Sequence, residues 1–144
     1  MKVTLTRVTE NPIGAIEEAA CNCYDSKPTG GKIMKSCYKS GHHSVLEFAD
    51  FTFHIEGVSR ALSHQLVRHR LASYAQGSQR YCGENGFEYV IPHTVEKDEE
   101  TKHTFTSLMG YIDMLYKRLQ DAGVPNEDAR YILPNACTTC IEVK

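Results

Sequence analysis

The polar chemistry of this chain is concentrated in one stretch, Arg68-His69-Arg70-Leu71-Ala72-Ser73-Tyr74-Ala75-Gln76-Gly77-Ser78-Gln79-Arg80-Tyr81. The stretch is rich in hydrogen-bond donors and has little that could build a core. Arginine guanidinium groups pair bidentately with phosphate or carboxylate. Gln76, Gly77 and Ser78 add an amide, a hydroxyl and a backbone that a ligand can approach closely. The stretch therefore predicts a binding site for a phosphorylated small molecule.

A helix is expected to lead into this stretch, because Ser59 is a good N-cap. Its predicted inward positions, spaced by about one turn, are Leu62, Leu66 and His69. The helix would bring Gln65 and the cations Arg68 to Arg70 near its C-terminal end, where the helix dipole stabilises positive charge. That effect is confined to the last turn and does not explain a polar run that continues to Arg80. A binding function is favoured over a purely structural one.

The rest of the chain predicts a mixture of strands and helices. Strands are expected at Lys2–Val8, at Phe48–Ile55, where Gly57 would end the strand, and at Phe87–Pro92. Helices are expected at Pro12–Cys23, Lys32–Lys39, Glu96–Ala122 and Asn126–Ile132. The third of these carries the clearest apolar stripe of the chain, which predicts core or a subunit interface.

Length, composition and charge limit the class of protein. The 144 residues suit one domain, and 41% hydrophobic with 24% charged residues is ordinary for a globular protein. A net charge of −2 argues against a general nucleic-acid-binding module. No apolar run could span a bilayer and the N-terminus does not resemble a signal peptide, so a cytoplasmic location is expected.

The six cysteines are expected to be reduced thiols, because no secretion signal accompanies them. Cys137 and Cys140 have the C-x-x-C spacing of redox and zinc sites. A second ligand pair with suitable spacing is missing, so no metal is expected. A structural or redox protein that uses this pair remains an alternative that only the spacing favours.

Four ordered elements resemble one enzyme family. Arg68-His69-Arg70 followed after seven residues by Ser78 resembles the R-H-R-x7-S signature of the flavin-dependent thymidylate synthases. The other matching elements are Gly41-His42-x-Ser44-x-x-Glu47, Phe51-Thr52-Phe53, and the segment Gly123-Val124-Pro125, Ala129-Arg130 and Leu133-Pro134. The resemblance covers nearly the whole chain in order, and four ordered elements together are specific.

The resemblance implies both a fold and a reaction. The fold would be α/β (α+β), a small, mostly antiparallel sheet packed with long helices, with residues 1–144 forming a single domain. The reaction would be the reductive methylation of dUMP to dTMP, with methylenetetrahydrofolate as carbon donor and FAD, reduced by NADPH, as hydride source. Members of the family are homotetramers with active sites built from several subunits, which predicts the same assembly here.

The resemblance also assigns site residues by position. Arg68, Ser78 and Arg80 would act at the catalytic centre. FAD would be bound by His42, Ser44, Arg68, His69, Arg70 and Gln76. The residues expected to hold dUMP are Gln65, Arg68, Gln76, Gly77, Ser78, Gln79, Arg80 and Arg130. A serine needs an adjacent base to attack at neutral pH, and none lies near Ser78 in the sequence, so a binding role is predicted for Ser78.

Two departures from the family pattern leave alternatives open. Ala75-Gln76 stands where many members have Asn-Glu, so a neutral amide replaces a carboxylate. The family's C-terminal segment, with further flavin and uracil contacts, does not follow Lys144. The chain is therefore expected either to be C-terminally truncated or to be completed by another polypeptide. A catalytically impaired protein that binds flavin or nucleotide is the alternative to an enzyme. Local nucleic-acid binding through Arg68 to Arg80 is weakened by the acidic balance.

Overall fold

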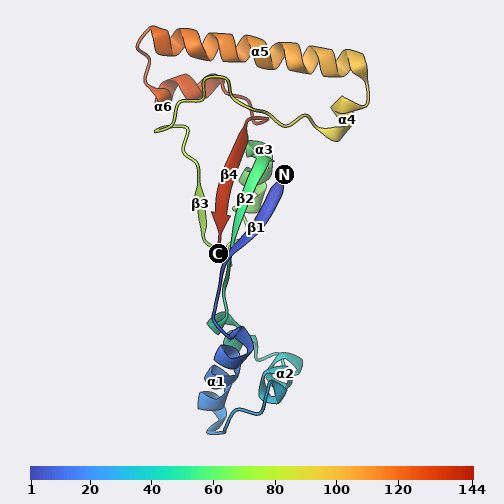
Figure 1. Ribbon diagram of the computed structural model, residues 1–144, viewed down its shortest axis with the longest axis vertical. Helices are drawn as coiled ribbons and strands as arrows, with labels where there is room; N and C mark the ends of the chain where they lie inside the picture. The colour runs from blue at the N-terminus through green and yellow to red at the C-terminus, as the bar shows by residue number, and fades with distance from the viewer. The chain divides into compact units, whose positions relative to one another are not determined.

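A computed structural model describes residues 1–144 and shows a four-stranded sheet in the order β1-β2-β4-β3 (Figure 1). The strands are β1 (Lys2–Val8), β2 (Phe51–Ser59), β3 (Tyr74–Gln76) and β4 (Thr138–Val143). β3 runs antiparallel to β4 with Gln76 opposite Ile141. The expected α/β (α+β) class with an antiparallel sheet is confirmed, and the strand expected at Lys2–Val8 is β1, at one edge of the sheet.

The chain forms two compact units, residues 1–3 with 54–143 and residues 4–53 with Lys144. In the second unit the helices are α1 (Pro12–Tyr24), α2 (Lys32–Lys39) and the 3-10 helix η1 (His43–Phe48). Their buried contact is made by Ile16, Ala20, Cys37 and Val45. The Glu17 carboxylate accepts from the Gly31 amide at 2.8 Å and from the Thr29 hydroxyl at 2.7 Å. These bonds hold the pKa of Glu17 below its usual value and join α1 to the start of α2.

The first unit contains the remaining helices, namely α3 (Arg60–Leu66), α4 (His93–Glu96), α5 (Glu99–Asp121), α6 (Asn126–Ala129) and the 3-10 helix η2 (Arg130–Ile132). The apolar stripe of α5 supplies Met109 to a core with Phe87 and Cys137. The predicted helix Glu96–Ala122 was nearly right, but it begins later, because Asp98 caps it and leaves α4 as a separate turn. Gly123, at φ 84°, lies just beyond its end, close to the predicted bound at Ala122.

Two strand predictions were wrong in their bounds. The expected strand Phe48–Ile55 is β2, which starts at Phe51 because Phe48 belongs to η1. Gly57 does not end β2, because it adopts a positive φ of 67° within the strand, which only glycine does without strain. The expected strand Phe87–Pro92 is reduced to one isolated bridge between Tyr89 and Cys137.

The predicted inward face of α3 was also wrong. Ser63 is the fully buried residue of this helix, whereas Leu62 is 40% exposed and His69 is exposed beyond its end. Ser59 caps the helix as expected by accepting from the Leu62 amide. The helix turns a hydroxyl toward the sheet because that hydroxyl is hydrogen-bonded on both sides, by the Arg60 carbonyl and by the Gln76 amide. Leu62 and Leu66 of the same helix line a cavity instead.

Asp98→Ala is expected to lower the melting temperature by a few degrees at pH 7, because the Asp98 carboxylate accepts from the hydroxyl and the amide of Thr101 at the start of α5. The same hydrogen bonds hold the pKa of Asp98 below its usual value. The stabilisation is therefore present above the unfolded pKa of ~3.9 and is lost as the pH falls through the lower folded value. Circular dichroism melts of Asp98→Ala and Asp98→Asn across pH 2–7 measure this. The asparagine variant should keep most of the cap, and an alanine effect of equal size at every pH would contradict the assignment.

Candidate functional site

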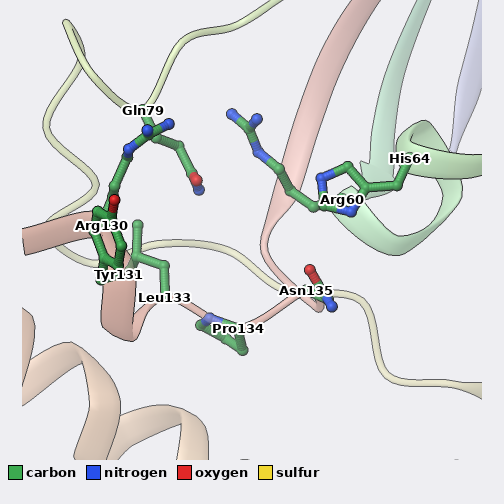
Figure 2. Close-up of a pocket in the computed structure, with 8 residues that line it drawn as sticks. All are labelled: Arg60, His64, Gln79, Arg130, Tyr131, Leu133, Pro134 and Asn135. Carbon is green, nitrogen blue, oxygen red and sulfur yellow. The ribbon is translucent and has the colours of Figure 1, made fainter. Parts of the chain in front are cut away.

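One cavity of the first unit gathers hydrogen-bond donors from three segments. We call it the Arg130 cavity; its volume is about 270 Å³ and it is lined by Arg60, His64, Gln79, Arg130, Tyr131, Leu133, Pro134 and Asn135. In the view of Figure 2, the guanidinium groups of Arg60 and Arg130 reach into it from opposite sides, with the Gln79 amide between them. Gln79 and Arg130 are predicted dUMP residues; Arg60 and His64 were missed.

Donors in the Arg130 cavity lack partners. Gln79 is only 9% exposed, and the buried Nε of Arg60 has no hydrogen-bond partner. Gln79 Nε2 has no well-aligned acceptor, and its side chain lies near the Glu84 carboxyl, where hydrogen bonding opposes the rise of that carboxyl's pKa. Arg130 donates from Nε to the Glu127 carbonyl at 3.1 Å, which fixes the start of η2 and leaves its terminal nitrogens without a hydrogen-bond partner. Buried polar groups are normally paired, so convergent donors without acceptors define a site for a ligand that carries acceptors, such as a phosphate or a carbonyl group.

A second cavity lies on the other side of Arg60. We call it the Ser78 cavity; its volume is about 370 Å³ and it is lined by Glu56, Gly57, Arg60, Gly77, Ser78, Cys82, Glu84, Glu88 and Thr138 to Cys140. Burial raises the pKa of the Glu84 carboxyl, and the nearby positive charge of Arg60 opposes that rise. Burial likewise lowers the pKa of Arg60, and Glu84 opposes it. The two side chains thus offset each other's charge at the boundary of the two cavities.

Ser78 begins a tight turn that presents its hydroxyl. Its Oγ accepts from the Arg80 amide at 3.3 Å, and its carbonyl accepts from the amides of Tyr81 and Cys82. Because Oγ is an acceptor within the chain, the hydroxyl proton is left to donate to a ligand. No base is hydrogen-bonded to Ser78, and its binding role stays a prediction. Arg80 is exposed and lies over the ring of Tyr81, 5.3 Å from its centroid.

The start of the R-H-R stretch borders a third, more apolar cavity. We call it the Arg68 cavity; it measures about 550 Å³ and is lined by Leu62, Gln65, Leu66, Arg68 and His69. The predicted helix extended too far, because α3 ends at Leu66 and Arg68 and His69 lie in the turns that follow it. These turns are closed by hydrogen bonds from the Arg68 and His69 amides. Arg70 is exposed and lines none of the three cavities.

Gln76 is committed to bonds within the chain. Its Nε2 donates to the Ser63 hydroxyl at 2.7 Å and to the Thr139 hydroxyl at 3.2 Å, so it bridges β3, α3 and β4. Only its carbonyl oxygen is left for a ligand. The amide that replaces the family's usual carboxylate thus has a structural task that an ionised carboxylate, lacking donors, could not perform in the same way.

The remaining predicted flavin residues, His42 and Ser44, belong to the other unit. His42 Nδ1 is hydrogen-bonded to the Tyr24 hydroxyl at 3.0 Å, and Ser44 is exposed in η1. Burial raises the pKa of Tyr24, so the phenol keeps its proton at neutral pH. The paired ring nitrogen leaves Nε2 of His42 for other contacts.

The C-x-x-C pair does not form a redox site. Cys137 is fully buried in the core and burial raises the pKa of its thiol to about 11, whereas reactive cysteines have lowered pKa values. All six cysteines are free thiols. The spacing arises because Cys137 precedes β4 and Cys140 lies within it. The buried Cys137 thiol therefore gives the redox alternative no support beyond the spacing.

Comparison with known proteins identifies the class. Residues 4–144 match the family described as thymidylate synthase complementing protein. The chain is 45% identical to the flavin-dependent thymidylate synthase of Geobacter sulfurreducens over 99% of its own length and 67% of the relative's. It is 42% identical to that of Pyrococcus furiosus over 99% of its own length and 65% of the relative's. The chain belongs to the thymidylate synthase complementing protein family, as its R-H-R-x7-S stretch suggested.

Solved structures confirm the fold. The chain resembles a UMP/dUMP methylase, PolB, from Streptomyces cacaoi bound with 5-Br dUMP, with a TM-score of 0.83 and 21% identity over 99% of this chain and 71% of that one. It also resembles thymidylate synthase X from Helicobacter pylori with FAD and dUMP, with a TM-score of 0.72 and 22% identity over 99% and 77%. No helix of the chain is both long and apolar enough to cross a membrane.

Proposed function

We propose that this chain carries out the reductive methylation of dUMP to dTMP, with methylenetetrahydrofolate as carbon donor and NADPH as the reductant of FAD. The observation that carries the proposal is the convergence of unpartnered donors on the Arg130 cavity, in a chain of this family. A nucleoside monophosphate offers phosphate oxygens and carbonyl oxygens as acceptors. Fixed positive charge near the base would also stabilise negative charge that develops on the uracil ring.

The dUMP residues divide between neighbouring cavities. Gln79 and Arg130 would bind from the Arg130 cavity, and Gly77 and Ser78 from the Ser78 cavity. Gln65 and Arg68 would reach the nucleotide from the Arg68 cavity, where Arg68 also faces the cofactor. The remaining proposed dUMP contacts are Gln76, through its free carbonyl oxygen, and Arg80. Arg68, Ser78 and Arg80 are the residues proposed to act at the reacting centre, Ser78 by binding.

The Arg68 cavity suits a flavin in its chemistry. Leu62 and Leu66 offer apolar surface to a ring system, while Arg68 and His69, followed by Arg70, offer donors and positive charge to a pyrophosphate. FAD, when bound, supplies the hydride. Arg68, His69, Arg70 and Gln76 would hold and orient it, and His42 and Ser44 would reach the flavin of a neighbouring site.

We further propose a homotetramer with shared sites. The proposed residues of one chain lie on three cavities and two units, so no single cavity holds a complete set. α5 also exposes apolar side chains along one face at intervals of three residues, namely Leu108, Tyr111 and Met114. An exposed apolar stripe of this kind marks an interface.

We also propose a cytoplasmic location, which the six free thiols support.

Titration of the purified chain with FAD and then with dUMP tests the proposal. We expect a yellow protein or uptake of added FAD, dUMP binding by calorimetry, and a tetramer by light scattering. A colourless protein that takes up no FAD would overturn the cofactor assignment. Binding of both without formation of dTMP would favour the alternative, a catalytically impaired flavin- and nucleotide-binding protein.

A further inference from the structure

Arg60 occupies an unusual position for a cation. It is the first residue of α3, directly after the Ser59 cap, where the positive end of the helix dipole disfavours positive charge. Burial lowers the pKa of its guanidinium, Glu84 and then Cys137 oppose that effect, and the positive charge of Arg130 adds to it. A guanidinium held at such a place needs a reason beyond helix formation.

Hydrogen bonds connect Arg60 to the nucleotide-binding stretch in a closed circuit. Arg60 Nη2 donates to the Gly77 carbonyl at 2.6 Å. The Arg60 carbonyl accepts from the Ser63 hydroxyl at 3.0 Å, and that hydroxyl accepts from Gln76 Nε2 at 2.7 Å. Gln76 and Gly77 are thus tied to α3 by two separate bonds, one through the side chain and one through the backbone. The circuit fixes the end of β3 where the turn at Ser78 begins.

The planarity of the peptide bond extends this control to Ser78. The Gly77 carbonyl and the Ser78 amide belong to one planar trans unit and point in opposite directions. The Gly77 amide donates to the Cys140 carbonyl at 3.1 Å, which fixes the preceding peptide as well. When Arg60 holds the Gly77 carbonyl, it therefore also sets the direction of the Ser78 amide and the origin of the Ser78 side chain. The guanidinium itself lines both the Arg130 cavity and the Ser78 cavity.

We propose that Arg60 is a positioning residue of the nucleotide site: its guanidinium holds the Gly77 carbonyl and so aims the Ser78 amide and hydroxyl at the bound nucleotide. The inference rests on the proposed function, because it assumes that dUMP is the ligand. It adds to that function a residue outside the R-H-R-x7-S stretch. A purely structural role would make Arg60 important for stability without any specific effect on dUMP.

The test compares Arg60→Ala, Arg60→Lys and the control Arg118→Ala, which removes an exposed arginine from the last turn of α5. The readouts are the dUMP dissociation constant of the FAD-loaded chain by calorimetry, the FAD dissociation constant, the melting temperature, and the Ser78 amide shift in ¹⁵N spectra. We expect Arg60→Ala to weaken dUMP binding about tenfold or more and to move the Ser78 amide resonance, with FAD affinity kept. Arg60→Lys should recover part of the loss, because an ammonium can still donate to the Gly77 carbonyl.

Several outcomes would overturn the inference. One is dUMP affinity in Arg60→Ala equal to that of Arg118→Ala; another is an unmoved Ser78 resonance. If Arg60→Ala does not fold, Ser63→Ala opens the other branch of the circuit, and it should weaken dUMP binding by a smaller factor; unchanged binding there would overturn the inference. A wild-type chain that binds no dUMP would instead contradict the proposed function, so the two failures are distinguishable.

Discussion

Arg130→Ala is expected to weaken dUMP binding by a factor of about ten to a hundred, the equivalent of ~1.5–3 kcal/mol for a charged hydrogen bond. Arg130 lines the Arg130 cavity opposite Arg60, and its Nε is already anchored to the Glu127 carbonyl. The terminal nitrogens are therefore held in place before the ligand arrives, and little conformational entropy is lost on binding. Calorimetric titration of the FAD-loaded chain with dUMP measures the change.

Arg118→Ala serves again as the control for Arg130→Ala and should leave dUMP affinity unchanged. The loss of dUMP affinity in Arg130→Ala should also depend on salt concentration less steeply than the loss caused by removing an exposed arginine contact, because Arg130 is partly buried. An unchanged dissociation constant in Arg130→Ala would remove the Arg130 cavity from the nucleotide site. Loss of dUMP and FAD binding together, with a lowered melting temperature, would instead assign Arg130 a structural role at the start of η2.

The sequence predicted a binding stretch but not how the fold distributes its residues among separate cavities. The spacing of Arg68 to Ser78 was enough to indicate the family, because that pattern is read along the chain. It could not show that Gln79 and Arg130 line one cavity, since that depends on how the loop after β3 lies against η2. Arg60 was missed for the same reason. The only local sign that Arg60 has a special role was its place at the first position of a helix, where positive charge is disfavoured.

Secondary structure was predictable where the signals were local. Ser59 marked the start of its helix correctly, and the helix expected from Pro12 does begin there, because capping signals act within a turn. β3 and β4 were missed because a short strand is stabilised by its partner, which lies far away in the sequence. β4 does carry a local signal in its β-branched residues Thr138, Thr139, Ile141 and Val143.

Tyr116→Ala is expected to destabilise the fold by ~3–5 kcal/mol, the usual cost of removing a large buried aromatic side chain. Tyr116 is the largest fully buried side chain of the chain, on the inner face of α5. Its hydroxyl accepts from the Glu84 amide at 3.3 Å and from Gln120 Nε2 at 3.2 Å. One residue thus combines core packing with the attachment of the segment that carries Glu84, the carboxylate that faces Arg60 in the Ser78 cavity.

Tyr116→Phe separates these two contributions. It keeps the ring but leaves the Glu84 amide without its acceptor, so a loss of ~1–3 kcal/mol is expected. Urea unfolding followed by circular dichroism measures both variants, and Tyr111→Phe is the matched control, because that tyrosine is 55% exposed on the same helix. Since Glu84 offsets the charge of Arg60, Tyr116→Phe should also weaken dUMP binding in the folded protein, whereas Tyr111→Phe should not. A different result would be a Tyr116→Phe variant that loses stability and still binds dUMP with the affinity of the wild-type chain. That result would show that the nucleotide site does not depend on the position of Glu84, and that the bond to the Gly77 carbonyl is enough to hold Arg60 in place.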